Sequence, residues 1–83
     1  MKIVKISSLG CPSCIIMNKV FNKIKEEYSF ELEELDYDFD DIKKYNAGNK
    51  MPVYIFYDGD HEIGRLVGEH SKEEFDNILR SNK

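Results

Sequence analysis

The sequence predicts a small α/β protein whose elements follow one another in the order β-α-β-α-β-β-α. Runs rich in Ile, Val and aromatic residues alternate with segments in which apolar residues recur every three or four positions, as on one face of a helix. The first strand–helix–strand unit favours parallel pairing, whereas Asp58-Gly59-Asp60 indicates a tight hairpin between the last two strands. We therefore expect one domain over residues 1–83, with a four-stranded mixed sheet flanked by three helices.

The first half of the chain is expected to form a strand, a helix and a second strand. Lys2 to Ser7 is the first strand, because it is rich in Ile and Val. The helix opens at Cys11-Pro12, since proline is favoured at the first helical position. Phe30 to Asp36, where apolar and acidic residues alternate, is the second strand. The buried face of the helix is expected to consist of Ile16, Met17, Val20, Phe21, Ile24 and Tyr28.

The second half is expected to add a short helix, a hairpin and a last helix. The short helix would run from about Asp38 to Tyr45. Val53 to Tyr57 is typical of a buried strand, and Glu62 to Val67 is the strand that returns from the hairpin. Ser71 followed by Glu74 is a capping box that opens the last helix. The apolar face of that helix is Phe75, Ile78 and Leu79.

Composition and charge exclude several classes of function. The 83 residues are 41% hydrophobic and 34% charged, which fits a folded domain and excludes a disordered chain. Net charge is −4, and seven of the eleven positions from Glu31 to Asp41 are acidic, so a nucleic-acid partner is not expected. The apolar stretch from Ile3 to Ile6 is too short for a signal or a membrane span. We expect a cytoplasmic monomer without membrane contact.

The motif Cys11-Pro12-Ser13-Cys14 stands where the first strand ends and the first helix begins. At a helix N-terminus, unpaired N–H groups and the helix dipole stabilise a thiolate, which is the form that attacks a disulfide. Cytoplasmic cysteines are expected to be reduced, catalytic or metal-bound rather than structural. We expect Cys11 to be the exposed nucleophile and Cys14, one turn into the helix, to resolve the mixed disulfide.

Metal binding is the alternative role for the two cysteines. A structural zinc site needs four ligands, and the chain offers only two cysteines with His61 and His70, which are not at ligand spacing. A zinc ion or cluster shared between two chains stays open, as does a non-catalytic module that holds a metal or a partner through its cysteines. We expect no bound metal or other cofactor beyond a redox-active Cys11–Cys14 disulfide.

Taken together, these residues resemble the thioredoxin superfamily over the whole chain. The resemblance is carried by the strand–cysteine motif–helix unit and by Leu35-Asp36-Tyr37-Asp38, Met51-Pro52, Gly59 and Gly68. It implies a thioredoxin-like fold in which Pro52 is a cis-proline opposite the cysteines. It also implies that the backbone of Met51 pairs with a bound substrate segment, and that Pro12 and Ser13 complete the substrate site.

Within that superfamily the sequence favours a reductase of protein disulfides over a glutathione-dependent glutaredoxin. The length and Pro12 are similar to a glutaredoxin. However, Ser13 replaces the usual aromatic residue, and residues 64–68 lack the glycine pair followed by an acid that glutathione binding implies. The expected partners are therefore disulfide-containing proteins, with an enzyme like thioredoxin reductase as electron donor.

Lys5 departs from the resemblance. It stands where thioredoxins place a buried acid that assists proton transfer at the second cysteine. If Lys5 were buried near the thiols, its ammonium would favour their anions. If instead its alkyl stem lay along a thinly covered sheet face, the ammonium would reach solvent. We expect the second arrangement.

Overall fold

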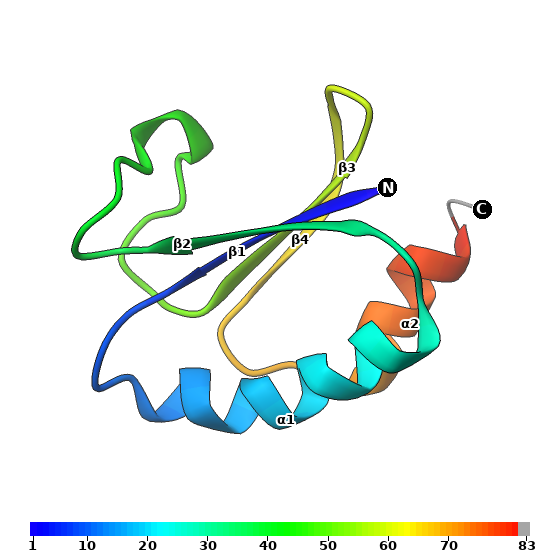
Figure 1. Cartoon of the computed structure of the whole chain (residues 1–83), viewed down its shortest axis with the longest axis horizontal. Coiled ribbons are helices and arrows are strands. Elements are labelled where there is room, and N and C mark those ends of the chain that lie inside the picture. The colour runs from blue at the N-terminus through cyan, green and yellow to red at the C-terminus, as the bar shows by residue number, and fades with distance from the viewer. Residues whose placement is uncertain (82–83) are drawn as a thin grey trace.

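A computed structural model describes residues 1–81, so the last two residues of the expected domain lie outside the described range. Four strands form one mixed sheet, as expected, and their order across the sheet is β2-β1-β3-β4 (Figure 1). Strand β1 pairs in parallel with β2 and antiparallel with β3, which in turn pairs antiparallel with β4. The bounds are β1 Lys2–Ser7, β2 Glu31–Asp36, β3 Val53–Asp58 and β4 His61–Val67.

Two helices, α1 (Pro12–Glu27) and α2 (Lys72–Ser81), cover the same face of the sheet (Figure 1). The expectation of a third helix is wrong, because residues 38–45 contain only one turn of 3₁₀ helix, at Lys43–Tyr45. The Asp36 carboxylate accepts a hydrogen bond from the backbone N–H of Asp38 at 2.8 Å, and Asp41 accepts from Lys43 at 3.1 Å. Such local bonds give the backbone an alternative to helical pairing, which explains why the α-helix does not form.

The main core lies between the sheet and the two helices. Phe75 of α2 is fully buried, with its ring centroid 5.0 Å from that of Tyr54, 5.8 Å from Phe56 and 6.1 Å from Phe21. Aromatic pairs at such separations and tilts add to the free energy gained by burial. The buried residues of this cluster are Ile3, Met17, Phe21, Ile24, Tyr54, Phe56, Leu66, Phe75 and Leu79.

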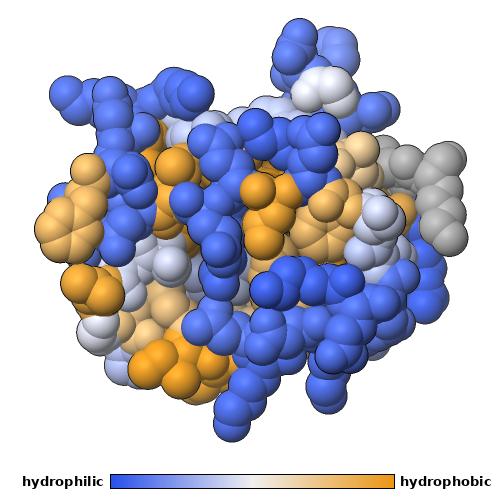
Figure 2. All heavy atoms as spheres, in the orientation of Figure 1, coloured by the Kyte–Doolittle hydropathy of each residue, from blue (hydrophilic) through white to orange (hydrophobic). Residues whose placement is uncertain are grey.

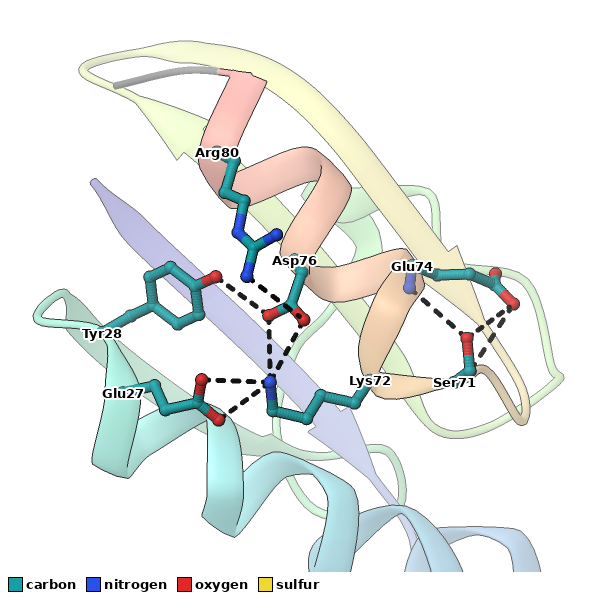
Figure 3. Close-up of polar contacts among 7 residues, drawn as sticks. All are labelled: Glu27, Tyr28, Ser71, Lys72, Glu74, Asp76 and Arg80. Carbon is teal, nitrogen blue, oxygen red and sulfur yellow. Dashed lines mark hydrogen bonds and ion pairs between the residues drawn. The ribbon is translucent and has the colours of Figure 1, made fainter.

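A polar network joins the last turn of α1 to α2 (Figure 3). The carboxylate of Asp76, which is buried, accepts a hydrogen bond from the Tyr28 hydroxyl at 2.9 Å and pairs with the Lys72 ammonium at 3.1 Å. Lys72 also pairs with Glu27 at 2.8 Å. The hydrogen bond from Tyr28 and then the contact with Lys72 hold the pKa of Asp76 below its ordinary value. These contacts join the C-terminal end of α1 to the first turns of α2.

The N-terminus of α2 has the expected capping box (Figure 3). The Glu74 backbone N–H donates to the Ser71 hydroxyl at 3.4 Å, and the Ser71 N–H donates to the Glu74 carboxylate at 3.5 Å. The same carboxylate group contacts the ring of His70. Two N–H groups that the helix itself leaves unpaired are therefore satisfied.

The opposite face of the sheet has no α-helix among the described residues. It lies under the irregular segment of residues 37–52, whose 3₁₀ turn supplies Tyr45. The buried residues of this second cluster are Val4, Ile6, Cys14, Tyr45, Met51, Val53 and Ile55. A hollow of about 680 Å³ lies in the segment itself, lined by residues 37–43 and 46–48, and contains neither cysteine.

The face of α1 that was expected to be buried needs one correction. Met17, Phe21 and Ile24 are buried, and Val20 and Tyr28 pack at the edge of the core, but Ile16 is 51% exposed. The polar contacts with α2 are made at Glu27 and Tyr28, at the other end of α1. Ile16 lies about 16 Å before Glu27 along the helix axis, so it is outside the part of α1 that these contacts hold against α2. No helix in residues 1–81 is long and apolar enough to cross a membrane.

Candidate active site

The cysteine motif lies at the junction of β1 and α1, as the sequence indicates. After Ser7 the chain turns through Gly10, which has a φ of +70°, and Cys11 takes the N-cap position with extended backbone. Its sulfur accepts a hydrogen bond from the backbone N–H of Cys14 at 3.2 Å. Pro12 begins the helix. The thiol of Cys11 thus takes the place of an N-cap oxygen, and it receives the helix N–H group of Cys14.

The two thiols differ in exposure. Cys11 is half-buried, whereas Cys14 is only 5% exposed, and neither is in a disulfide. Burial raises the pKa of Cys14 to about 11, and its hydrogen bond with Cys11 acts in the same direction. The main chain of Ser8 and the ammonium of Lys5 lower the pKa of Cys14 against these effects. One thiol is therefore accessible, and the other keeps its proton until something withdraws it.

A third segment reaches the cysteines from the start of β3. The Met51–Pro52 peptide is cis, and Pro52 is fully buried. The thiol of Cys11 donates to the Met51 carbonyl at 3.8 Å, although the two residues are 40 positions apart. The N–H of Gly68 donates to the Pro52 carbonyl at 2.8 Å and ties this segment to the end of β4. Met51 and Pro52, named from the sequence, thus lie beside Cys11.

Ser13 has a contact that the sequence analysis missed. Its hydroxyl donates to the carboxylate of Glu69 at 3.0 Å, across 56 positions of the chain. Glu69 follows Gly68, which carries part of the family resemblance, so its place beside the site could have been inferred from that neighbour. The contact puts one acidic, exposed side chain next to the motif.

The expectation that Lys5 reaches solvent is wrong. Its side chain is 11% exposed, and the ammonium donates to the Asn18 side-chain oxygen at 2.6 Å. Strand β1 turns Lys5 toward the face covered by α1, where the helix lies over the sheet closely enough to enclose the long side chain.

The two histidines lie away from the cysteines. His61 is exposed at the start of β4, and the ring of His70 contacts the Val67 carbonyl at 2.9 Å. Within residues 1–81, no three His, Cys, Asp or Glu side chains converge as a metal site would require. What these residues do assemble is a dithiol at a helix N-terminus, with a backbone carbonyl beside the outer sulfur.

Comparisons with known proteins agree with this geometry at the level of structure. No protein-family model matches the sequence, and a search of curated proteins gave no significant match. Among solved structures, thioredoxin 1 from the thermophilic eubacterium Thermosipho africanus is similar over 100% of both chains, with 25% identity and a TM-score of 0.77. The thioredoxin of Fasciola hepatica is 26% identical over 95% of this chain and 78% of its own, with a TM-score of 0.76.

A more distant relative shares the fold. Thioredoxin-2 of a malaria parasite, described as a component of that parasite's protein secretion machinery, has a TM-score of 0.85. The match covers 96% of this chain and 81% of the parasite protein at 14% identity. The sheet order, the place of the cysteines at the start of α1 and these structural relatives lead to one conclusion: the chain belongs to the thioredoxin superfamily.

Proposed function

We propose that the protein is a thiol–disulfide oxidoreductase that reduces disulfides in other proteins. The observation that carries the proposal is the pairing of an accessible thiol, Cys11, at the cap of α1 with a buried thiol, Cys14, one turn behind it. A nucleophile needs access to its substrate, whereas a resolving thiol must wait until the first bond has formed. The difference in exposure supports these two roles.

The reaction would take place in two exchanges. The thiolate of Cys11 attacks one sulfur of the substrate disulfide, and the other substrate sulfur leaves with the electron pair and takes up a proton. Cys14 then loses its proton and attacks the Cys11 sulfur. The second substrate thiol departs with that proton, and a Cys11–Cys14 disulfide remains. Two electrons have moved to the substrate, and an external donor must return them.

Exposed apolar side chains around the motif support a protein substrate. Leu9 is 74% exposed and Ile15 64%, and both lie within two residues of a cysteine. Figure 2 shows apolar atoms gathered at the end of the molecule where α1 begins. Exposed apolar surface of this kind marks interaction sites. The expectation of a monomer assumed that no such surface was left over; we assign it to substrate contact, and the monomer stays a prediction.

The test compares two electron donors for the oxidised protein. We expect turnover of a protein disulfide with thioredoxin reductase and NADPH, and none with glutathione and glutathione reductase. Turnover with glutathione alone would make the protein a glutaredoxin instead. Cys11→Ser should abolish reduction, whereas Cys14→Ser should accumulate a mixed disulfide between Cys11 and the substrate. If neither donor supports turnover and Cys11 resists alkylation at neutral pH, the proposal is wrong.

A further inference from the structure

Lys5 is a buried lysine whose charge is only partly compensated. Its ammonium contacts the Asn18 side-chain oxygen at 2.6 Å, and the Glu34 carboxylate lies 3.6 Å away. Both partners are exposed, and the ring centroid of Phe21 lies 5.5 Å from the ammonium on the inner side. Burying a charge is costly unless it is paired and hydrogen-bonded. Asn18 lies one turn after Cys14 in α1, and its hydrogen bond keeps the Lys5 ammonium close to the first turns of that helix.

Tyr54 is the residue opposite Lys5 in the pairing of β1 with β3. It is fully buried, and its hydroxyl has no hydrogen-bond partner among the described residues. An unpartnered buried hydroxyl costs free energy, and phenylalanine would fill the same space without that cost. Packing alone therefore does not explain why this residue is tyrosine rather than phenylalanine.

Both groups lie near the turn of α1 that follows Cys14, because Asn18 of that turn accepts a hydrogen bond from the Lys5 ammonium and Tyr54 stands opposite Lys5. The Lys5 ammonium lowers the pKa of Cys14, and burial, followed by the charge that Cys14 would carry, raises the pKa of Tyr54. A phenol with a raised pKa keeps its proton and can donate a hydrogen bond to an anion. Among residues 1–81, the titratable or charged groups that act on this pair are Cys14 of α1, Cys11 at its N-cap and Glu34 of β2.

We propose that Lys5 and Tyr54 support the thiolate of Cys14 in the resolving step, the ammonium by its charge and the hydroxyl as a free donor. The inference rests on the proposed function. In the step itself, Cys14 gives up its proton, its sulfur bonds to Cys11, and the bond from Cys11 to the substrate sulfur breaks. The departing sulfur takes the electron pair and the proton. Lys5 and Tyr54 are positioning residues, because they act only through Cys14.

The test isolates the resolving step with a small thiol. The mixed disulfide between Cys11 and a chromophoric aromatic thiol is formed on the protein, and release of that thiol is followed in single turnover as a function of pH. Lys5→Met should move the midpoint of the profile to higher pH by about one unit and slow release at neutral pH about tenfold. Tyr54→Phe should slow release several-fold without lowering stability, because no hydrogen bond is lost. Lys5→Arg, which keeps the charge, should restore most of the rate.

Two variants serve as matched controls. Lys2→Met removes another lysine of β1, one whose ammonium pairs with Glu33. Tyr28→Phe removes a hydroxyl that donates to Asp76. Both residues lie outside the site. Neither should change the release profile. An unchanged profile in Lys5→Met or in Tyr54→Phe would overturn that residue's part in the proposal. Because the assay uses a small thiol, it gives an answer even if the protein reduces no protein disulfide, so the two proposals fail separately.

Discussion

The two faces of the sheet are covered in different ways. One face lies under α1 and α2 (Figure 1). The core on this face contains the aromatic rings of Phe21, Tyr54, Phe56 and Phe75. The other lies under residues 37–52, in which regular structure is limited to one 3₁₀ turn. The first covering consists of elements with their own hydrogen bonds, so it is stable and fixed. The second depends on local turns and on a few buried side chains.

The cysteine motif lies where the two coverings meet. Cys14 belongs to the cluster under the irregular segment, although it stands on α1, and Met51 of that segment contacts Cys11. Lys5 and Tyr54 approach from the helix-covered face. The helix-covered face therefore fixes the position of the thiols, while the other face supplies a carbonyl beside them. This arrangement puts Cys11, at the N-cap of a helix, beside a segment whose regular structure is one 3₁₀ turn.

The largest expected effect tests which face carries stability. Phe75→Ala should lower the free energy of unfolding by about 3–5 kcal/mol, because it leaves a cavity among the three aromatic rings that surround Phe75. Tyr45→Ala, on the other face, should cost only about 1–2 kcal/mol, since the irregular segment can settle into the space. Urea unfolding of both variants gives the comparison. Should Phe75→Ala fail to fold, Phe75→Leu replaces it, and equal losses on the two faces would contradict the comparison.

Alkaline pH should weaken the protein through Cys14. The pKa of this thiol is raised by burial from 9.0 to about 11, so its stabilising effect is complete below pH 9 and is lost as the pH rises toward 11. Urea midpoints of the reduced protein should fall over that range. Cys14→Ala should make the decline shallower, leaving the part due to Tyr54, whose pKa burial also raises. An identical decline in Cys14→Ala would show that the Cys14 thiol does not cause the loss of stability.

Acidic pH should weaken the helix-covered face through Asp76. Hydrogen bonding from Tyr28 and pairing with Lys72 hold the pKa of Asp76 below its ordinary 3.8, so the stabilisation is present above that pH and is lost as the pH falls through the lowered value. Asp76→Asn should be less stable at neutral pH and should lose less on acidification. Glu33→Gln, at an exposed pair with Lys2, is the control and should change the acid profile less.

The smallest expected effect concerns the connection after β4. Gly68 has a φ of +83°, and an added Cβ would lie 3.0 Å from the Cε atom of Lys50. Gly68→Ala should cost about 1–2 kcal/mol of stability, because other residues are strained at positive φ. Gly59 has a φ of +63° and open space around it, so Gly59→Ala has the backbone strain without a steric contact. The melting temperature of Gly68→Ala should lie slightly below that of Gly59→Ala, and equal melting temperatures would show that Lys50 moves aside freely.

Much of the fold follows from local pattern. The strand at Lys2–Ser7 has its expected bounds, and the helix opens at Pro12 as the proline indicates. The capping box of Ser71 and Glu74 is present. These features depend on neighbours within a few residues, so the sequence displays them directly. The helix expected at residues 38–45 failed for a local reason too, because its aspartates bond to nearby N–H groups.

The sequence by itself determined the strands, the first and last helices and the placement of the two cysteines at a helix N-terminus. Only the tertiary structure decided that Lys5 is buried, that Tyr54 has an unpartnered hydroxyl and that Glu69 contacts Ser13. The physical reason is the distance along the sequence over which each kind of interaction acts. Periodicity and capping act over a turn or a strand, whereas these contacts join segments up to 56 positions apart. Such segments meet only when the sheet is assembled and α1 closes over one of its faces.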